Sequence, residues 1–231
     1  MSIYEQTRDI EGWLMPGETQ LLYDLARDFG DVILEVGTFR GRSATVLTSG
    51  AARRRGVRLS KAQFFSIDIN PAARLLAYEL LRRRGLASRA LFFHGTLPEF
   101  RAKFPITPTL AFIDGDHTYE GVLADLAELS TLLAPNTPVV FHDYMNPDTP
   151  GVSKAVDEWC QNGFANVVQT IDASAQVLTT TRCSGKRRHY PDRAFRAARG
   201  ELMLPLKHRI AARMPWLVPI VRTLKGRSRT E

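Results

Sequence analysis

Two hydrophobic patterns alternate along the 231-residue chain between residue 19 and residue 180. Short continuous apolar runs are typical of strands that are buried on both faces of a parallel sheet. Apolar residues three and four positions apart are typical of helices that bury one face. The apolar runs predict strands over residues 31–36, 64–69, 90–94, 109–114, 138–143, 165–171 and 175–181.

Helical spacing predicts one helix before the first of these strands and others between the first six. The expected helices cover residues 19–29, a segment from about Ser43, residues 71–85, residues near 119–133 and a segment after Gly151. Thr19 is the expected N-cap of the first helix. Only residues 172–174 join the last two strands, which is too short for a parallel crossover, so we expect an antiparallel hairpin there. The predicted fold class is therefore a doubly wound, seven-stranded α/β sheet, mostly parallel with an antiparallel last strand.

The composition indicates an ordinary globular protein, with 44% hydrophobic and 24% charged residues. Its two cysteines are too few for a disulfide framework. Residues 1–15 lack the apolar stretch of a signal peptide, and no run approaches the roughly 18 apolar residues of a membrane-spanning helix. We therefore expect a cytoplasmic protein.

The net charge of +7 is distributed unevenly along the chain. Residues 1–184 carry 18 basic and 21 acidic side chains, whereas residues 185–231 carry 13 basic and 3 acidic ones. We expect a folded domain over residues 1–184, whose mildly acidic balance argues against a nucleic-acid partner. The basic C-terminal appendage over residues 185–231 suits either a disordered solvated segment or peripheral contact with an anionic membrane surface.

A glycine-containing turn, EVGTFRGRS over residues 35–43, follows the first predicted strand. Glycines there allow the backbone to approach a ligand, and the next helix start supplies N–H donors. The G-x-x-x-G spacing differs from the dinucleotide-binding motif and from the phosphate-binding loop, whose lysine is absent from residues 31–60. Asp68 ends the second strand, where a carboxylate can accept hydrogen bonds from ribose hydroxyls. Glu35 and Asp68 at two successive strand ends favour a ligand site.

Acidic residues also end the fourth and fifth predicted strands. These are Asp114 and Asp143, with Asp116, His117 and His142 close by. The carboxyl ends of parallel strands meet at one crevice, and paired carboxylates suit Mg²⁺, Ca²⁺ or Mn²⁺. The alternative is that Asp114 and Asp116 only cap turns, which leaves Asp143 and the two histidines unexplained. The pattern therefore favours a divalent metal site.

The segments EVGTFRGRS, SIDI, FIDGDHTYEGVLADL and VVFHDY together resemble class I S-adenosylmethionine-dependent methyltransferases. More narrowly, they are similar to the branch that contains macrocin-type sugar O-methyltransferases and cephalosporin-hydroxylase-like proteins. The resemblance covers roughly residues 12–181, and DGDHTYE is its most specific part. It implies a Rossmann-like methyltransferase fold.

The resemblance also implies which residues bind S-adenosylmethionine. Ser43 would cap the helix beside the cofactor, Asp68 would hold the ribose, and residues 94–96 would flank the adenine. The full set of expected cofactor residues is Glu35, Gly37, Gly41, Ser43, Asp68 and Asp114.

The expected catalytic residues are Asp114, Asp143 and His117. By the resemblance, Asp114 and Asp143 bind a divalent cation, expected to be Mg²⁺, and His117 is the general base. His142 departs from the acid that is common at its position. We expect it to be a weak third metal ligand, an orienting group, or the sign of a different metal.

The predicted function is metal-assisted O-methylation of a sugar, glycoside or similar polyol by S-adenosylmethionine. A sugar hydroxyl is a weak acid, so chelation and a general base would be needed to remove its proton. Two alternatives remain open: a non-catalytic S-adenosylmethionine-binding module, and an RNA 2′-O-methyltransferase whose basic tail contacts phosphates. The expected partners are a small-molecule or glycan acceptor and further copies of the chain in a homo-oligomer. Residues 11–17 would form a lid over the crevice, or Trp13 would simply pack.

Overall fold

The computed structural model describes residues 1–54 and 63–180 of the chain. Seven strands in these residues form one sheet in the order β3-β2-β1-β4-β5-β7-β6. Strand β7 is antiparallel to both of its neighbours, whereas β1 to β5 pair in parallel, so the predicted fold class is confirmed. The strands are β1 (Val32–Val36), β2 (Gln63–Asp68), β3 (Ala90–His94), β4 (Leu110–Ile113), β5 (Pro138–Phe141), β6 (Ala165–Ile171) and β7 (Ser174–Thr179).

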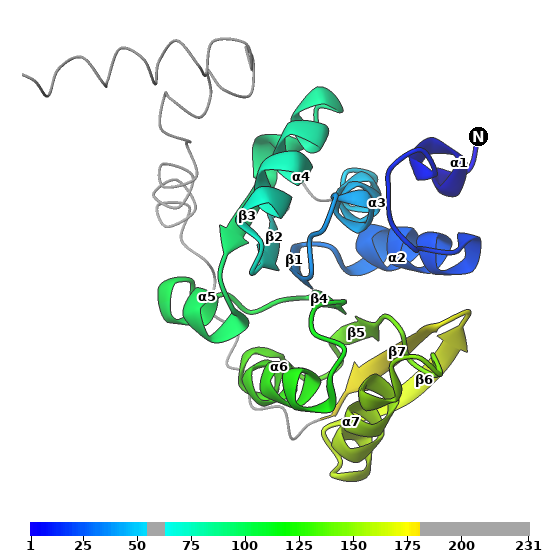
Figure 1. The fold of residues 1–231 in the computed structure, drawn as a ribbon, viewed down its shortest axis with the longest axis vertical. Coiled ribbons are helices and arrows are strands. Elements are labelled where there is room, and N and C mark those ends of the chain that lie inside the picture. The colour runs from blue at the N-terminus through cyan, green and yellow to red at the C-terminus, as the bar shows by residue number, and fades with distance from the viewer. Residues whose placement is uncertain (55–62, 181–231) are drawn as a thin grey trace, which may run out of the picture. The chain divides into compact units, whose positions relative to one another are not determined.

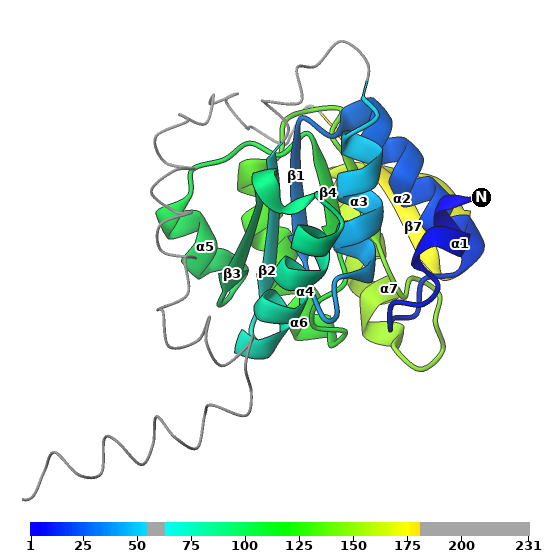
Figure 2. The same ribbon diagram turned by 90° about the horizontal axis from the view of Figure 1, so that it is seen from above.

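Helices cover both faces of the sheet (Figure 1; Figure 2). One layer contains α1 (Ile3–Thr7), α2 (Pro16–Phe29), α3 (Arg42–Ala51) and α4 (Pro71–Arg83). The other contains α5 (Leu97–Lys103), α6 (Tyr119–Leu132) and α7 (Pro150–Gln161), and a short 3-10 turn (Ala87–Arg89) precedes β3. The central strands are almost completely buried between these layers, as continuous apolar runs predict.

The order of the strands reverses between β1 and β4. From β1 the chain moves outward through β2 and β3, and it then returns to place β4 on the other side of β1. Segments that leave adjacent strands in opposite directions open a crevice at the carboxyl ends of those strands. The fold therefore places the glycine-containing turn after β1 beside the acidic loops after β4 and β5.

Helix α2 begins earlier than predicted. It starts at Pro16, so the prediction of Thr19 as its N-cap is wrong, and Thr19 lies buried inside the helix. The carboxylate of Glu18 accepts a hydrogen bond of 2.8 Å from the backbone N–H of Met15. Proline suits the first helical position, because it has no N–H to leave unsatisfied. These two local features fix the start of the helix.

Helix α3 begins at Arg42, with Gly41 as its N-cap at φ 84°. The expectation that Ser43 caps this helix is therefore wrong, because Ser43 already lies in its first turn. Helices α1 and α5 were not located from the sequence. For α5 a signal was present, since Thr96 and Glu99 form a capping box at its start.

The predicted basic appendage over residues 185–231, with its boundary at residue 184, lies outside the described residues. Among the residues that are described, no helix is both long enough and apolar enough to cross a membrane.

Candidate functional site

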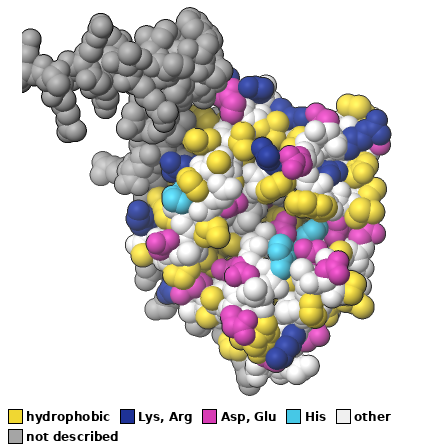
Figure 3. All heavy atoms as spheres, in the orientation of Figure 1, with side chains coloured by type: hydrophobic (Ala, Val, Ile, Leu, Met, Phe, Trp, Pro, Cys, Tyr) yellow, Lys and Arg dark blue, Asp and Glu magenta, His cyan; other side chains and the backbone are white. Residues whose placement is uncertain are grey.

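A cavity of about 1010 Å³ lies at the carboxyl ends of the central strands. Its size is at the upper end of the roughly 300–1,000 Å³ that is usual for small-molecule sites. On one face of the molecule, histidine and acidic side chains lie close together and are bordered by apolar ones (Figure 3). Predicted site residues that line the cavity are Gly37, Ser43, Asp68, Asp114, His117, His142 and Asp143.

The two glycines of the turn after β1 have different surroundings. Gly37 has φ 95°, and a Cβ added there would lie 1.9 Å from the carbonyl oxygen of Asp114. Only glycine therefore allows the turn to approach the end of β4 so closely. Gly41 faces α4, where an added Cβ would lie 2.8 Å from the Cβ of Ala77, and it does not line the cavity.

Asp68 holds the turn after β1 from the end of β2. Its Oδ2 accepts hydrogen bonds of 3.0 Å from the backbone N–H groups of Thr38 and Phe39. Its Oδ1 accepts a hydrogen bond of 2.7 Å from the N–H of Asn70. An ionised carboxylate offers about four acceptor positions, so capacity for a further donor from the cavity remains.

Glu35 lies beneath the turn and does not line the cavity. It is completely buried, and the hydroxyl of Ser66 donates a hydrogen bond to its carboxyl group. Burial raises the pKa of Glu35 to about 8, against the opposing effect of the hydroxyls of Ser66 and Ser43. In this environment Glu35 is neutral at pH 7 and supports the turn from inside the protein.

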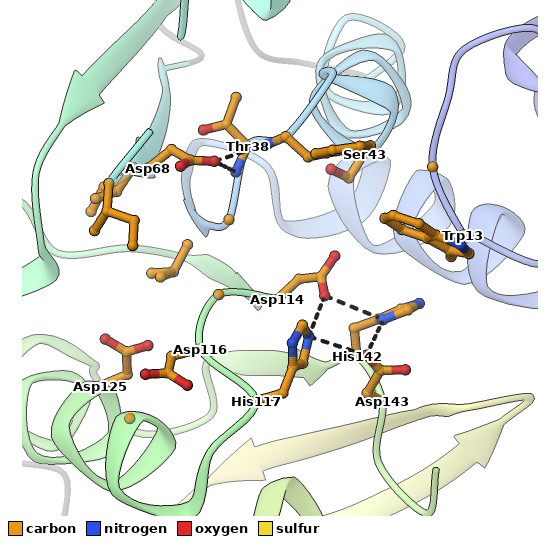
Figure 4. Close-up of a pocket in the computed structure, with 18 of the residues that line it drawn as sticks. Trp13, Thr38, Ser43, Asp68, Asp114, Asp116, His117, Asp125, His142 and Asp143 are labelled. Carbon is orange, nitrogen blue, oxygen red and sulfur yellow. Dashed lines mark hydrogen bonds and ion pairs between the residues drawn. The ribbon is translucent and has the colours of Figure 1, made fainter. Parts of the chain in front are cut away.

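Four predicted residues converge where β4 and β5 end (Figure 4). Asp114, His117, His142 and Asp143 each offer one ligand atom, and these atoms all lie within 4.8 Å of one another. Nε2 of His117 lies 3.2 Å from Oδ1 of Asp114 and 3.1 Å from Oδ2 of Asp143. Nδ1 of His142 lies 3.2 Å and 3.5 Å from the same two oxygens. The structure therefore brings together the residues that the sequence placed at two strand ends.

Glu18 of α2 adjoins this cluster and was not predicted as a site residue. Its Oε2 lies 3.6 Å from Nε2 of His142, and its Oε1 accepts a hydrogen bond of 2.8 Å from the hydroxyl of Ser174. Glu18 is 1% exposed. In the sequence it is an ordinary acid in the first turn of a helix, and only the packing of α2 onto the sheet brings it to His142.

The charged groups of the cluster shift one another's pKa values. Burial by itself would lower the pKa of His142, but Asp114 and Glu18 outweigh that effect and raise the pKa to about 11. Burial would raise the pKa of Asp114 and of Glu18, yet the facing histidines lower both. The hydrogen bond to Asp114 raises the pKa of His117. At neutral pH the described residues therefore hold charged acids around an imidazolium.

The segment before α2 forms another wall of the cavity. Trp13 is 73% exposed, and its ring centroid lies 5.2 Å from that of Phe39. Nη1 of Arg42 donates a hydrogen bond of 2.7 Å to the carbonyl oxygen of Gly12, which ties the segment to α3. Figure 4 shows Trp13 on the same side of the cavity as His142.

One protein-family model matches part of the chain. Residues 34–144 match the model of a family described as a methyltransferase domain. Residues 34–144 are thus similar to a methyltransferase domain. The matched residues include the turn after β1, Asp68 and the whole cluster at the ends of β4 and β5.

Solved structures with the same fold include several described as O-methyltransferases. TomG from Streptomyces achromogenes, in complex with S-adenosylmethionine, is 19% identical, covers 77% of this chain and 86% of its own, and has a TM-score of 0.59. An O-methyltransferase from Bacillus cereus with S-adenosylhomocysteine is 16% identical, with coverages of 77% and 89% and a TM-score of 0.61. CalS11, described as a TDP-rhamnose 3′-O-methyltransferase, is 20% identical, with coverages of 69% and 76% and a TM-score of 0.56. A search of curated proteins found no match.

Proposed function

We propose that this methyltransferase domain transfers the methyl group of S-adenosylmethionine to a hydroxyl oxygen of a sugar, glycoside or similar polyol. One observation carries the proposal: the carboxylates and imidazoles of the four-residue cluster converge within 4.8 Å in a cavity that Asp68 also lines. Such a cluster suits removal of a proton from an alcohol. The activities described for TomG and CalS11 support an oxygen acceptor, and that of CalS11 supports a sugar.

The cofactor would occupy the part of the cavity between the turn after β1 and Asp68. Asp68 would accept hydrogen bonds from the ribose hydroxyls with its remaining acceptor capacity. The turn at Gly37 leaves room for the cofactor. The first backbone N–H groups of α3 would face the carboxylate of its methionine part. The methyl group would then point toward Asp114.

A divalent cation fits the donor chemistry of the cluster. Asp114 and Asp143 offer carboxylate oxygens, and His142 would offer Nδ1, which lies 3.2 Å and 3.5 Å from the nearest oxygen of each acid, once a bound ion displaces its proton. Carboxylates suit Mg²⁺ and Mn²⁺, whereas imidazole also suits Zn²⁺ and Fe²⁺. When bound, such an ion would lower the pKa of a chelated hydroxyl group.

His117 would act as the general base. Two acids lie near its Nε2, which orients the ring, and its raised pKa makes the neutral imidazole a stronger base. The hydroxyl proton would pass to His117 while the acceptor oxygen forms a bond to the methyl carbon. The bond between that carbon and sulfur would break, with its electron pair remaining on sulfur as S-adenosylhomocysteine.

Cofactor binding is tested by titrating S-adenosylmethionine into the protein in a calorimeter. Saturable binding is expected for the wild type and for Asp28→Ala, which changes an exposed acid outside the cavity. Asp68→Ala is expected to weaken binding at least tenfold, because it removes the ribose acceptor. Absence of binding to the wild type would contradict the proposal.

Catalysis is tested by following S-adenosylhomocysteine formation with TDP-rhamnose and simple vicinal-diol glycosides as acceptors. His117→Ala is expected to lower the rate by about 10²-fold or more. Chelation of metal should abolish the rate, and added Mg²⁺ or Mn²⁺ should restore it. Cofactor binding without turnover of any polyol would favour a binding module, and turnover of RNA alone would favour a ribose 2′-O-methyltransferase.

A further inference from the structure

His142 lies at the end of the cavity near Trp13, away from Asp125 (Figure 4). The histidine is 6% exposed, and its ring meets that of Phe112 edge to face, with the two centroids 6.3 Å apart. Among residues 1–54 and 63–180, neither ring nitrogen of His142 makes a well-aligned hydrogen bond, although carboxylate oxygens lie on both sides of the ring. Polar atoms that are buried this deeply are normally hydrogen-bonded, so the two nitrogens need a further explanation.

The distances around Nδ1 of His142 match those between ligands of one metal ion. Two donor atoms that bind the same ion, each about 2.1 Å from it, lie about 3–3.5 Å apart. Nδ1 lies 3.2 Å from Oδ1 of Asp114 and 3.5 Å from Oδ2 of Asp143. Nδ1 is therefore placed as a third ligand of the cation site that the proposed function assigns to these two acids, and the inference rests on that function.

The other ring nitrogen faces a carboxylate that the protein holds in place. Oε2 of Glu18 lies 3.6 Å from Nε2 of His142. The same oxygen accepts a hydrogen bond of 2.8 Å from the N–H of Met15, and Oε1 accepts one of 2.8 Å from the hydroxyl of Ser174. Neither hydrogen bond involves His142, so the start of α2 and the start of β7 fix this carboxylate beside Nε2.

Capping of α2 does not by itself explain Glu18. An exposed glutamate would accept the N–H of Met15 equally well, whereas Glu18 is 1% exposed, and burying a carboxylate is costly unless positive or donor groups face it. A carboxylate can only accept, so Glu18 favours a proton on Nε2 of His142. The lone pair of Nδ1 is then free to bind an ion. Histidines that bind metals usually donate their other N–H to such an acceptor.

We propose that Glu18 positions His142 as a nitrogen ligand of the cation site, and that this pair makes the site prefer a transition-metal ion, such as Mn²⁺ or Fe²⁺, over Mg²⁺. Imidazole suits transition-metal ions, whereas Mg²⁺ prefers oxygen ligands. With Asp114 and Asp143 alone, the site would offer only oxygen ligands. Glu18 is a positioning residue, because it acts on the cation through His142.

Titration of the full chain with Co²⁺ and with Mg²⁺ at a fixed pH tests the inference through the ratio of the two dissociation constants. The wild type is expected to bind Co²⁺ about 100-fold or more tightly than Mg²⁺. Glu18→Gln is expected to reduce that ratio about tenfold or more, because the neutral amide is a weaker acceptor for the proton on Nε2. Loss of a negative charge alone would weaken binding of both ions alike and leave the ratio unchanged.

Glu158→Gln is the matched control. Glu158 lies outside the cavity and accepts a hydrogen bond from the hydroxyl of Tyr119, so the substitution neutralises a hydrogen-bonded glutamate elsewhere in the protein. It is expected to leave the ratio unchanged. His142→Ala is expected to lower the ratio, and adding Glu18→Gln to that variant should lower it no further. Thermal unfolding shows which of the variants are folded.

Two results would overturn the inference. One is a wild type that binds Mg²⁺ as tightly as Co²⁺ or binds neither ion, which depends on no variant. The other is a folded Glu18→Gln protein with the ratio of the wild type. Formation of S-adenosylhomocysteine with a polyol acceptor is measured separately, so the proposed function can stand when the inference fails. Failure of the wild type to bind S-adenosylmethionine would contradict the proposed function instead.

Discussion

Glu35 and His142 show that neighbours decide the charge of a buried side chain as much as burial does. Glu35 is completely buried and meets hydroxyl groups, so its pKa rises to about 8 and it is neutral at pH 7. His142 is also buried, but Asp114 and Glu18 face it, and its pKa rises to about 11. Burial favours the neutral form in both cases. Only the histidine has neighbours that reverse the effect.

Replacing Glu35 by Gln is expected to change how stability depends on pH. The pKa of Glu35 is higher in the folded protein than its ordinary value of 4.5, so folding binds a proton between these values. The wild type should therefore lose roughly 1.4 kcal/mol of unfolding free energy per pH unit from this group between about pH 5 and pH 7. Glutamine keeps an acceptor for Ser66 and stays neutral. Urea unfolding over this pH range should show that the free energy of unfolding of Glu35→Gln rises relative to that of the wild type as the pH increases. The same pH dependence in both proteins would contradict the prediction.

The turn between β1 and α3 is the element on which the cofactor site depends. In this turn Gly37 has a positive φ and lies close to the end of β4, and Asp68 accepts hydrogen bonds from two backbone N–H groups. Gly85, after α4, offers a comparison, because it also has a positive φ of 73° but nothing lies within 4 Å of an added Cβ. The two positions separate the cost of the backbone conformation from the cost of the close approach.

Gly37→Ala is expected to be far more damaging than Gly85→Ala. Both substitutions force alanine into left-handed backbone, which costs about 1–2 kcal/mol. Only at Gly37 would the new Cβ also meet a backbone oxygen, at 1.9 Å, so the total loss should exceed about 3 kcal/mol. Thermal unfolding and titration with S-adenosylhomocysteine measure both effects. Similar stabilities for the two variants would show that the turn can move away from β4 at little cost.

At the scale of the whole molecule, the cavity joins parts of the chain that are far apart in sequence. Glu18 of α2, the strand ends from β1 to β5 and Ala173 of the β6–β7 turn all line it. A ligand that contacts several of these segments stabilises their common arrangement and has no such site in the unfolded chain. Cofactor binding should therefore be visible as a change in global stability.

S-Adenosylhomocysteine is expected to raise the melting temperature. At about 100 times its dissociation constant, a ligand adds about 2.7 kcal/mol to the free energy of unfolding. For a domain of this size that corresponds to roughly 5–10 °C. Scanning calorimetry should show the full shift for the wild type and for Asp28→Ala but about half of it or less for Asp68→Ala, whose binding is at least tenfold weaker. A shift of the same size in Asp68→Ala would show that Asp68 does not contribute to cofactor binding.

The sheet was predictable because strands buried on both faces leave continuous apolar runs such as VILEV, and the short joint at residues 172–174 revealed the hairpin. The cluster was predictable in outline, because Asp114 and Asp143 follow strands whose ends must meet. Glu18 and Asp125 were not, since each lies within a helix and reaches the cavity only through the way that helix packs. The burial of Glu35 away from the cavity likewise depends on how closely the turn above it approaches β4.

The two ends of the cavity are built from separate stretches of chain. Residues 11–15 and the β6–β7 turn border the end near Trp13, whereas the loops after β2 and β3 and one side of α6 border the end near Asp125. The first group also contacts the turn after β1, because Trp13 packs on Phe39 and the carbonyl oxygen of Gly12 accepts a hydrogen bond from Arg42. Under the proposed function, substitutions in the N-terminal residues that change the acceptor therefore also change a neighbour of the turn that binds the methyl donor.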